Sequence, residues 1–444
     1  MKKFVQTLKN IWGIDELRSK IIVTLSFVLI YRFGSYVVLP GIDPNKLSSL
    51  AGAKSGALGL IDAFSGGAFL HASVLALGIM PYISASIFMQ LMTILVPQMQ
   101  KVQKEGESGR KKINQWTRYL TVIVTAAQAA AYVQYLNKMG HDAILESFGY
   151  FWLTTPILLT AGTLFVMWLG EKITDKGLGN GTSLIIMVGI LARLPNAIRQ
   201  EFVAKSASGS GGILIFIIEI AVMITVILGL IVLIQGVRKV PVNYAKQIVG
   251  NRQFGGARQF LPLKVNSAGV MPIIFAQAIM FLPTLISYTS FENKEGISSI
   301  FSDPKNFLHM IIYAVIVILF TFLYTALIFN PKQIADDLKR NNGFIPGVKP
   351  GQPTADFIGG VMDKITFPGA VLLAIVGILP GFAQRLGVTQ SFASFFGGTS
   401  LLIMVGVILD TLQQIETQLL MRQYDGLMKS GRIQGRQSVT SAVI

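Results

Sequence analysis

The sequence of 444 residues contains no cysteine and few charged residues. The absence of cysteine excludes disulfides, thiolate catalysis and Cys-ligated metal sites. Only 14% of the residues are Asp, Glu, Lys or Arg, whereas soluble domains contain about a quarter. The three histidines, His71, His141 and His309, lie too far apart in the sequence to predict a metal site. With 52% hydrophobic residues, the composition excludes a soluble enzyme, a disordered tail and a fibrous protein.

Long apolar runs are abundant and predict membrane-spanning helices, because about 20 apolar residues cross a bilayer core of about 30 Å. The runs are continuous instead of alternating in polarity, which excludes a transmembrane β-barrel. No small-residue cleavage pattern follows the first run, so we expect a retained helix and not a signal peptide. The sequence predicts an all-α polytopic membrane protein with ten spans. The runs lie at about 21–39, 72–98, 119–136, 151–170, 177–192, 213–236, 266–289, 307–329, 365–384 and 395–418.

The net charge is +16, from 38 Lys and Arg against 22 Asp and Glu. If the N-terminus is cytoplasmic, the ten spans place 28 of the basic residues on the cytoplasmic side and 9 on the other, with Arg32 inside a span. The positive-inside rule therefore predicts that both termini are cytoplasmic.

An internal repeat joins the two parts of the chain. Residues 181–190 (GTSLIIMVGI) and 398–407 (GTSLLIMVGV) are identical at eight of ten positions, and 78–83 (GIMPYI) resembles 269–274 (GVMPII). These segments fall in spans five and ten, and in spans two and seven. A duplicated unit of five spans must enter the membrane upside down the second time, which predicts two inverted halves around a central pathway. We place the halves at 1–200 and 201–444.

The matched segments indicate where the pathway narrows. Pro81 and Pro272 each remove a helix hydrogen bond, so we expect both spans to bend there, at the pathway or merely for packing. The repeated elements also present Ile79, Ile83, Ile186, Ile274 and Ile403. Aliphatic side chains at a constriction would stay dewetted and exclude ions. The alternative is that these isoleucines face lipid or neighbouring helices.

Charged residues within the predicted spans are few: Arg32, Glu219, Asp410 and Glu416. Glu219 and Glu416 lie near span ends, where we expect interfacial solvation. Asp410 lies deeper and is the one good candidate for the titratable site that an ion-coupled transporter needs. Capping of a helix by Asp410, or its pairing with a basic loop, would explain this carboxylate at least as well.

Two long loops carry an unbalanced basic charge. Residues 237–264 contain six Lys and Arg and no acidic residue, and 330–366 are punctuated by Pro and Gly. Orientation in the membrane does not require a loop of this length. Anionic partners are therefore expected, either lipid headgroups or nucleic-acid phosphates.

Seven ordered motifs resemble the SecY family, the central subunits of bacterial protein-translocation channels, over about residues 10–436. The motifs are 64–67 (FSGG), 76–86 (ALGIMPYISAS), 104–111 (KEGESGRK), 167–171 (MWLGE), 242–246 (VNYAK), 261–266 (LPLKVN) and 397–403 (GGTSLLI).

The resemblance implies an hourglass pore between two five-helix halves, with site residues carried over by position. Its aliphatic pore ring corresponds to Ile79, Ile83, Thr182, Ile186, Ile274 and Ile403, where Thr182 replaces the usual apolar residue. The non-spanning stretch 56–70, with Leu58, Leu60, Ile61 and Phe64, resembles the plug that closes the outer funnel; an ordinary surface loop is the alternative. Polar positions of the lateral gate correspond to Gln90, Gln128 and Asn266.

The basic loops resemble those that bind the ribosome and the SecA motor ATPase, which favours ribosomal RNA over lipid as the anionic partner. The docking residues implied are Arg238, Lys239, Lys246, Arg252, Arg258 and Lys349. Lys349 stands where the family typically has Arg, so the planar bidentate fork is lost at that tip.

The sequence as a whole predicts a passive protein-conducting channel in the bacterial inner membrane, without catalytic residues, cofactors or metals. It would translocate secretory preproteins, release membrane helices sideways, and be driven by SecA or the ribosome. Further expected partners are small subunits resembling SecE and SecG, signal sequences and anionic lipids. The alternatives are an inverted-repeat transporter of a small solute and a structural scaffold for membrane-protein assembly.

Overall fold

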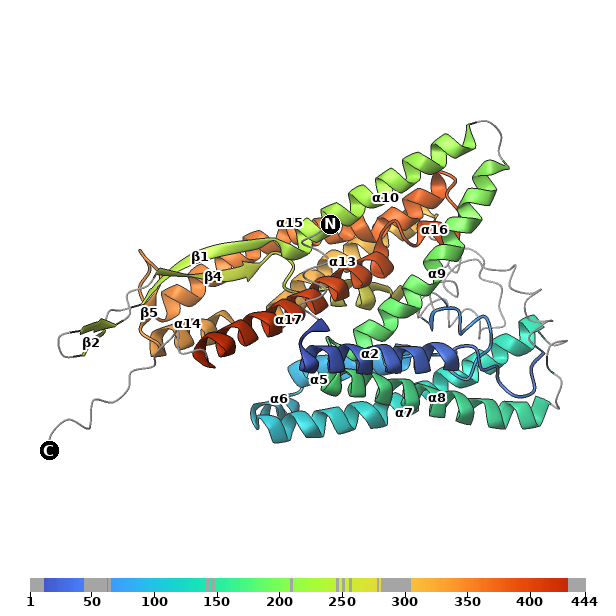
Figure 1. The fold of residues 1–444 in the computed structure, drawn as a ribbon, viewed down its shortest axis with the longest axis horizontal. Helices are drawn as coiled ribbons and strands as arrows, with labels where there is room; N and C mark the ends of the chain where they lie inside the picture. The colour runs from blue at the N-terminus through green and yellow to red at the C-terminus, as the bar shows by residue number, and fades with distance from the viewer. Residues whose placement is uncertain are drawn as a thin grey trace.

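The computed structural model is mainly helical and describes residues 12–43, 62, 65–140, 144, 148–207, 211–244, 247–249, 252–254, 258–277, 279–280 and 305–429. Figure 1 shows two groups of helices. One contains α2 and α5 to α8, the other contains α10, α13, α15 and α17, and α9 runs from the first group toward the second. The predicted division at residues 200 and 201 falls within α9 (Gly181–Ser206) and stays a prediction.

The first group is built from long helices in contact with one another. Its elements are α2 (Asp15–Gly34), α5 (Met80–Leu95), α6 (Pro97–Lys104), α7 (Glu107–Gly140) and α8 (Phe148–Lys176), and α9 (Gly181–Ser206) follows them along the chain. Helix α8 and helix α9 approach very closely, because a Cβ atom at Gly181 would lie only 2.0 Å from the carbonyl oxygen of Gly170. Small residues permit such contacts between membrane helices, where no hydrophobic force from water drives association.

The second group packs around a pair of long helices, α13 and α15. Its elements are α10 (Gly212–Gln235), α13 (Phe307–Ile328), α14 (Pro331–Arg340), α15 (Gln352–Arg385), α16 (Gln390–Ala393) and α17 (Gly398–Lys429). Between α10 and α13, a further short helical stretch is described at 271–277.

The basic loop 237–264 forms β-strands, which the sequence analysis did not predict. Strand β1 (Val237–Tyr244) pairs antiparallel with β4 (Arg258–Lys264) and with β5 (Gly343–Phe344), while β2 (Gln247–Val249) pairs with β3 (Arg252–Phe254). Val240 and Val242 are buried on one face of β1 and Leu263 faces them from β4. This alternation of apolar residues is the period-two signal of a half-buried strand.

The polytopic helical architecture is confirmed. Among the described residues, six helices are long and apolar enough to cross a membrane, or seven if the bent pair α5–α6 counts as one span. Helices α2 and α7 coincide with two further predicted spans, 21–39 and 119–136. The predicted span 266–289 lies only partly within the described residues. Ten spans therefore remain consistent with the structure.

The repeated decapeptides occupy equivalent places, because Gly181 begins α9 and Gly398 begins α17. The start of α9 is bonded to the later part of α17 through Gly179 and Gln414. The end of α9 is bonded to the connector before α17 through Glu201 and Thr389. The two helices therefore run antiparallel, as inverted halves require.

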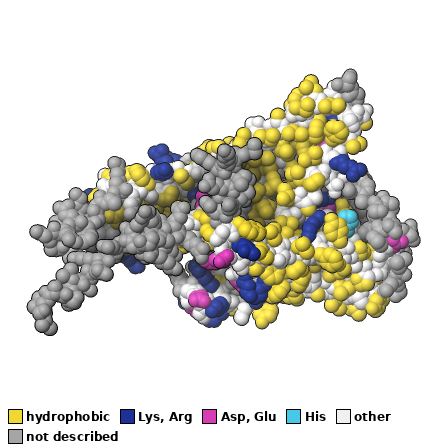
Figure 2. Space-filling model, in the orientation of Figure 1, with side chains coloured by type: hydrophobic (Ala, Val, Ile, Leu, Met, Phe, Trp, Pro, Cys, Tyr) yellow, Lys and Arg dark blue, Asp and Glu magenta, His cyan; other side chains and the backbone are white. Residues whose placement is uncertain are grey.

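The surface has the character expected of a membrane protein. Figure 2 shows hydrophobic side chains over much of the face formed by α2, α9 and α10. Exposed residues there include Leu25, Leu29, Leu214 and Val232. Lipid tails, rather than water, are the matching environment for such a belt.

Candidate functional site

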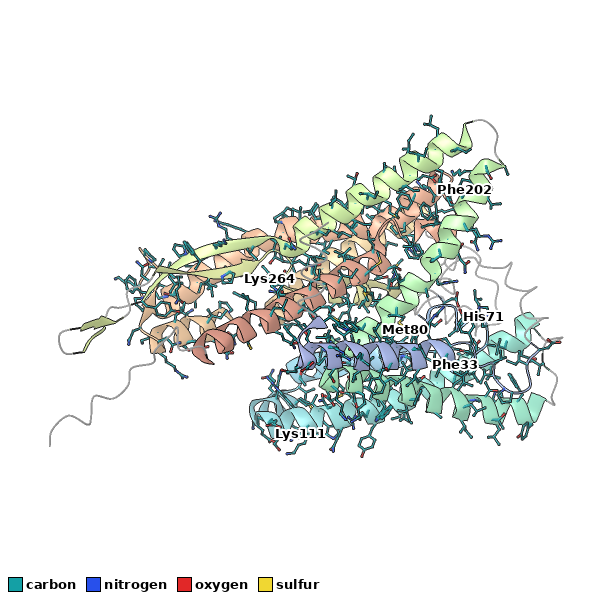
Figure 3. The ribbon with its side chains drawn as sticks, viewed as in Figure 1. Phe33, His71, Met80, Lys111, Phe202 and Lys264 are labelled. Carbon is teal, nitrogen blue, oxygen red and sulfur yellow. The ribbon has the colours of Figure 1, made fainter. Side chains whose placement is uncertain are left out.

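The five isoleucines predicted for the pore ring lie in one hydrophobic cluster, which we call the central cluster. Ile79, Ile186 and Ile403 are buried members, and Ile83 and Ile274 pack against it partly buried. Figure 3 shows Met80, the neighbour of Ile79, in the middle of the molecule, between the two groups of helices. Other buried members of the central cluster are Leu75, Leu184, Ile185, Ile190, Phe392, Phe396 and Val407.

Two of the segments that supply these isoleucines begin with the same turn. Gly78 and Gly269 have φ angles of +54° and +64°, a left-handed conformation that glycine adopts without strain. Pro81 and Pro272 are each the second residue of the helix that follows. The expectation that these prolines bend a continuous span is therefore wrong. Both start a helix, a position where the missing N–H is not needed.

The turns place ring residues in the same register. The Ile83 N–H donates to the carbonyl of Ile79 at 3.1 Å, and the Ile274 N–H donates to the carbonyl of Val270 at 3.3 Å. Ile83 and Ile274 thus lie one turn inside their helices at matching positions of the repeat. Two helices that start near the middle of a bundle are the discontinuous elements expected around a central pathway.

Thr182 adjoins the ring with its methyl group. Its hydroxyl donates to Asn180 Oδ1 at 2.6 Å, the same oxygen that caps the start of α9. A Cβ atom built on Gly170 would lie 3.1 Å from Thr182 Cγ2 and 3.5 Å from Ile79 Cδ1. The methyl group of Thr182 and the tip of Ile79 therefore share one neighbourhood, and the polar end of Thr182 is satisfied elsewhere.

One of the predicted gate residues bridges the two halves. The hydroxyl of Tyr324 on α13 donates to Gln90 Oε1 on α5 at 2.6 Å, and Gln90 Nε2 donates to Ser86 Oγ at 3.4 Å. Tyr324 is 7% exposed. Tyr324 could not be predicted from the sequence, because no local pattern distinguishes a tyrosine that pairs with a residue 234 positions away.

An aromatic seam surrounds this hydrogen bond. Phe275 stacks on Phe320 of α13 with ring centroids 5.2 Å apart and lies 5.9 Å from the ring of Tyr324. Ile87 of α5 belongs to the same buried cluster. We call these residues, with Gln90, the α5–α13 seam.

The other two predicted gate amides, Gln128 and Asn266, take no part in the hydrogen bond between Tyr324 and Gln90. Gln128 on α7 and Asn266 are half-buried, and Asn266 Oδ1 is buried with no hydrogen-bond partner in the described ranges of the chain. Within the described part of the chain, no hydrogen bond joins Gln90, Gln128 and Asn266. The amide of Gln90 is paired with a phenol instead.

The predicted plug residues Leu58, Leu60, Ile61 and Phe64 lie outside the described residues. The end of the same segment is well anchored. Asp62 is fully buried and forms an ion pair with Arg193 of α9, and it accepts a hydrogen bond from the Leu70 N–H at 3.0 Å.

Further hydrogen bonds hold residues 65–70. Arg32 of α2, the basic residue predicted inside a span, donates to the carbonyl of Gly66 at 2.9 Å. Tyr132 of α7 donates to the carbonyl of Phe69 at 2.7 Å. Contacts from three helices therefore fix the root of the segment, defined as Asp62 and residues 65–70.

The two basic loops form one structural unit, which we call the platform: β1, β4, β5, α14 and the first turns of α15. Pairing of β5 with β1 joins the second loop to the first. Val240, Leu263, Leu338, Ile345 and Ile358 are buried between them.

The docking residues implied by the resemblance lie mostly on this unit. Arg238 and Lys239 are exposed on β1, and Lys349 is exposed in the turn between β5 and α15. Arg252 begins β3 and Arg258 begins β4. Lys246 lies outside the described residues.

Comparison with known proteins shows the family of the chain. The family model for SecY matches residues 73–412. The chain belongs to the SecY family. The protein translocase subunits SecY of Mycobacterium tuberculosis H37Rv and of Chlamydia muridarum are each 39% identical, over 97% of this chain and 100% of theirs. Protein translocation across a membrane is therefore the general activity of the chain.

Solved structures of SecY-type channels share the fold. A protein-conducting channel superposes with a TM-score of 0.64 at 17% identity, and a SecY studied for its plug domain superposes with 0.62 at 18%; both alignments cover 96% of this chain and 95% of the other. Sec61 from a canine ribosome-channel complex superposes with 0.58 at 16% identity, with the same coverage.

Asp410 does not lie in the central cluster of this SecY-family chain. It is exposed and lines an open cavity of about 620 Å³ between the start of α2 and α17, together with Glu16 and Lys20. Gln413, Gln414 and Gln418 of α17 also line it.

Proposed function

We propose that the chain is a passive channel that conducts unfolded polypeptides through the central cluster and releases apolar helices through the α5–α13 seam. The observation that carries the proposal is the convergence of Ile79, Ile83, Ile186, Ile274 and Ile403, from both halves, on one cluster. Aliphatic side chains offer no hydrogen bonds to a hydrated ion, so the constriction stays closed to ions and yields to a flexible chain. The methyl group of Thr182 completes the ring.

The α5–α13 seam is suited to open sideways. The hydrogen bond that crosses the seam among the described residues, between Tyr324 and Gln90, is of a type worth about 0.6 kcal/mol between membrane helices. A sufficiently apolar helix can offset such a loss by its own transfer into lipid. The half-buried amides of Gln128 and Asn266 stay proposed members of this gate. The plug, with Leu58, Leu60, Ile61 and Phe64, is proposed to close the funnel from its anchored root.

The platform is the proposed docking surface for the partner that delivers the polypeptide, the ribosome or the SecA motor. Exposed Arg238, Lys239 and Lys349 suit phosphate or carboxylate groups. With the platform cytoplasmic, both termini are cytoplasmic and the membrane is the bacterial inner membrane. SecE-like and SecG-like subunits and anionic lipids complete the proposed assembly.

A site-specific crosslinking experiment tests the pore. Because the chain has no cysteine, a single cysteine at Ile79 or Ile274 carries a photoactivatable group without side reactions. A preprotein stalled in transit should be captured from both positions. Val232 on α10, 72% exposed, is the matched control and should capture none.

Two outcomes would contradict the proposal. Export that continues without capture at Ile79 and Ile274 would exclude the central cluster as the pathway, and equal capture at Val232 would mean that the label reports proximity alone. A scaffold for membrane-protein assembly predicts the first outcome. A small-solute transporter predicts that Asp410→Asn abolishes solute uptake in vesicles while preprotein export continues.

A further inference from the structure

The seam between α9 and α17 is held at both ends by the connectors that precede these helices. The first connector, 177–180, joins α8 to α9, and the second, 386–389, follows α15 and leads through α16 to α17. The first connector is bonded to α17, the fifth long helix of the second half, and the second connector is bonded to α9, the fifth long helix of the first half. About 20 residues of α9 separate the two sets of bonds, which corresponds to about 30 Å of helix.

The bonds of the 177–180 connector are neutral. The Gly179 N–H donates to Gln414 Oε1 of α17 at 2.9 Å, and the Leu178 N–H donates to Thr24 Oγ1 of α2 at 3.0 Å. Gly179 has a φ of +73°, and a Cβ atom there would lie 3.1 Å from Thr411 Oγ1. Gln414 is exposed, so water can replace this contact at little cost.

The bonds of the 386–389 connector are charged. The N–H and the hydroxyl of Thr389 both donate to Glu201 Oε2 of α9, the N–H at 2.8 Å. Lys205 Nζ donates to the carbonyl of Gly387 at 3.1 Å. Lys205 also pairs with Glu219 of α10 at 3.0 Å and with Glu201 at 3.6 Å.

This network is buried. Glu201 is 0% exposed and Glu219 is 7% exposed. The sequence-based expectation that Glu219 is solvated at the interface is therefore wrong. A buried carboxylate that loses its partner is left as an uncompensated charge, which is far more costly than the loss of a neutral exposed bond.

We propose that these two sets of bonds hold the halves together, because the connector of each half is bonded to the fifth helix of the other half. We further propose that the charged set is the fixed pivot of the α9–α17 seam. Glu201, Lys205 and Thr389 are then positioning residues. They hold the far end of the α9–α17 seam while the end near Gly179 and Gln414 gives way during transit. The movement of the end near Gly179 and Gln414 during transit rests on the proposed channel function. The holding of the seam by the charged set does not.

Spin-label distances in the resting protein test the pivot. Two cysteines, at Gln200 and at Leu386, give exposed label sites beside the charged network. Lys205→Met removes the one cation between two carboxylates and should broaden the Gln200–Leu386 distance distribution roughly twofold. Glu201→Gln keeps an acceptor for Thr389, so that distribution should stay narrow.

Two more variants complete the resting test. Lys176→Met removes an exposed lysine far from the network and should change nothing. Thr389→Val removes one donor without unpairing a charge and should broaden the distribution less than Lys205→Met, which keeps the test usable if Lys205→Met does not fold. An unchanged distribution in both Lys205→Met and Thr389→Val would overturn the proposal.

A second label pair, at Lys176 and Gln413, reports the neutral end. With a preprotein stalled in the protein, we expect the Lys176–Gln413 distance to change and the Gln200–Leu386 distance to stay fixed. An equal or larger change at Gln200–Leu386 would overturn the assignment of the pivot. If no preprotein enters at all, the channel function fails, and the resting comparison still decides whether the charged network holds the seam.

Discussion

Replacing Tyr324 by Phe should loosen the closed α5–α13 seam without disturbing its packing. The substitution removes the hydroxyl that donates to Gln90 Oε1 at 2.6 Å. It keeps the ring, which lies 5.9 Å from that of Phe275. Gln90 retains its contact with Ser86, so only the bond across the seam is lost.

The size of the effect follows from the burial of the pair. Hydrogen bonds between membrane helices average about 0.6 kcal/mol and reach about 1.7 kcal/mol, and a buried acceptor left unpaired costs about 1–3 kcal/mol. Tyr324 is buried and Gln90 is half-buried, so we expect the closed seam to lose about 1 kcal/mol. The ratio of open to closed channels should then rise about fivefold, at about 1.4 kcal/mol per factor of ten.

The assay is the export of a preprotein whose signal sequence is weakened by a polar substitution in its apolar core. Tyr324→Phe should export it more efficiently than the wild type. Tyr313→Phe is a matched control, because Tyr313 lies on the same helix and its buried hydroxyl has no hydrogen-bond partner among the residues that the structure describes. The effects of Tyr324→Phe and Gln90→Leu should not add, since both break one bond. Equal export by the two Tyr→Phe variants, or full additivity with Gln90→Leu, would refute the reasoning.

Three further predictions concern the plug root, helix packing and docking. Asp62→Asn unpairs the buried arginine contact of the root, and we expect a higher resting ion conductance in planar bilayers; unchanged conductance would exclude a sealing role. Gly181→Ala places a methyl group against a carbonyl oxygen of α8 and should lower the unfolding temperature in detergent, whereas Gly229→Ala, with open space around it, should leave it unchanged or raise it. The pair Arg238→Glu with Lys239→Glu should weaken ribosome or motor binding to vesicles, and the binding of the wild type should fall with salt; salt-independent binding would argue against an electrostatic platform.

Much of the architecture could be predicted from the sequence, because uninterrupted apolar runs identify membrane helices. The decapeptide repeat also predicted the antiparallel relation of α9 and α17. The repeat at Gly78 and Gly269 was expected to mark bends within two spans, but it marks the starts of two helices. Both copies form a glycine turn followed by a proline at a helix start, and a proline reads the same in sequence whether it starts a helix or kinks one.

Two of the missed features depend on residues far apart in the chain. Tyr324 meets Gln90 only after both halves have assembled, and the same holds for Glu201 and Thr389. The strands of the platform were missed for another reason. Their apolar alternation at Val240 and Val242 is short and lies within a strongly basic loop, where charge dominated the interpretation.

The platform is also joined to one end of a long helix, α15. Helix α15 begins on it, with Ile358 and Met362 buried against the strands, and continues without interruption to Arg385. Its 34 residues correspond to about 50 Å of helix, longer than the bilayer core is thick. We expect a partner that tilts the platform to shift the far end of α15 as well, and the internal prolines Pro368 and Pro380 are sites where this helix can bend.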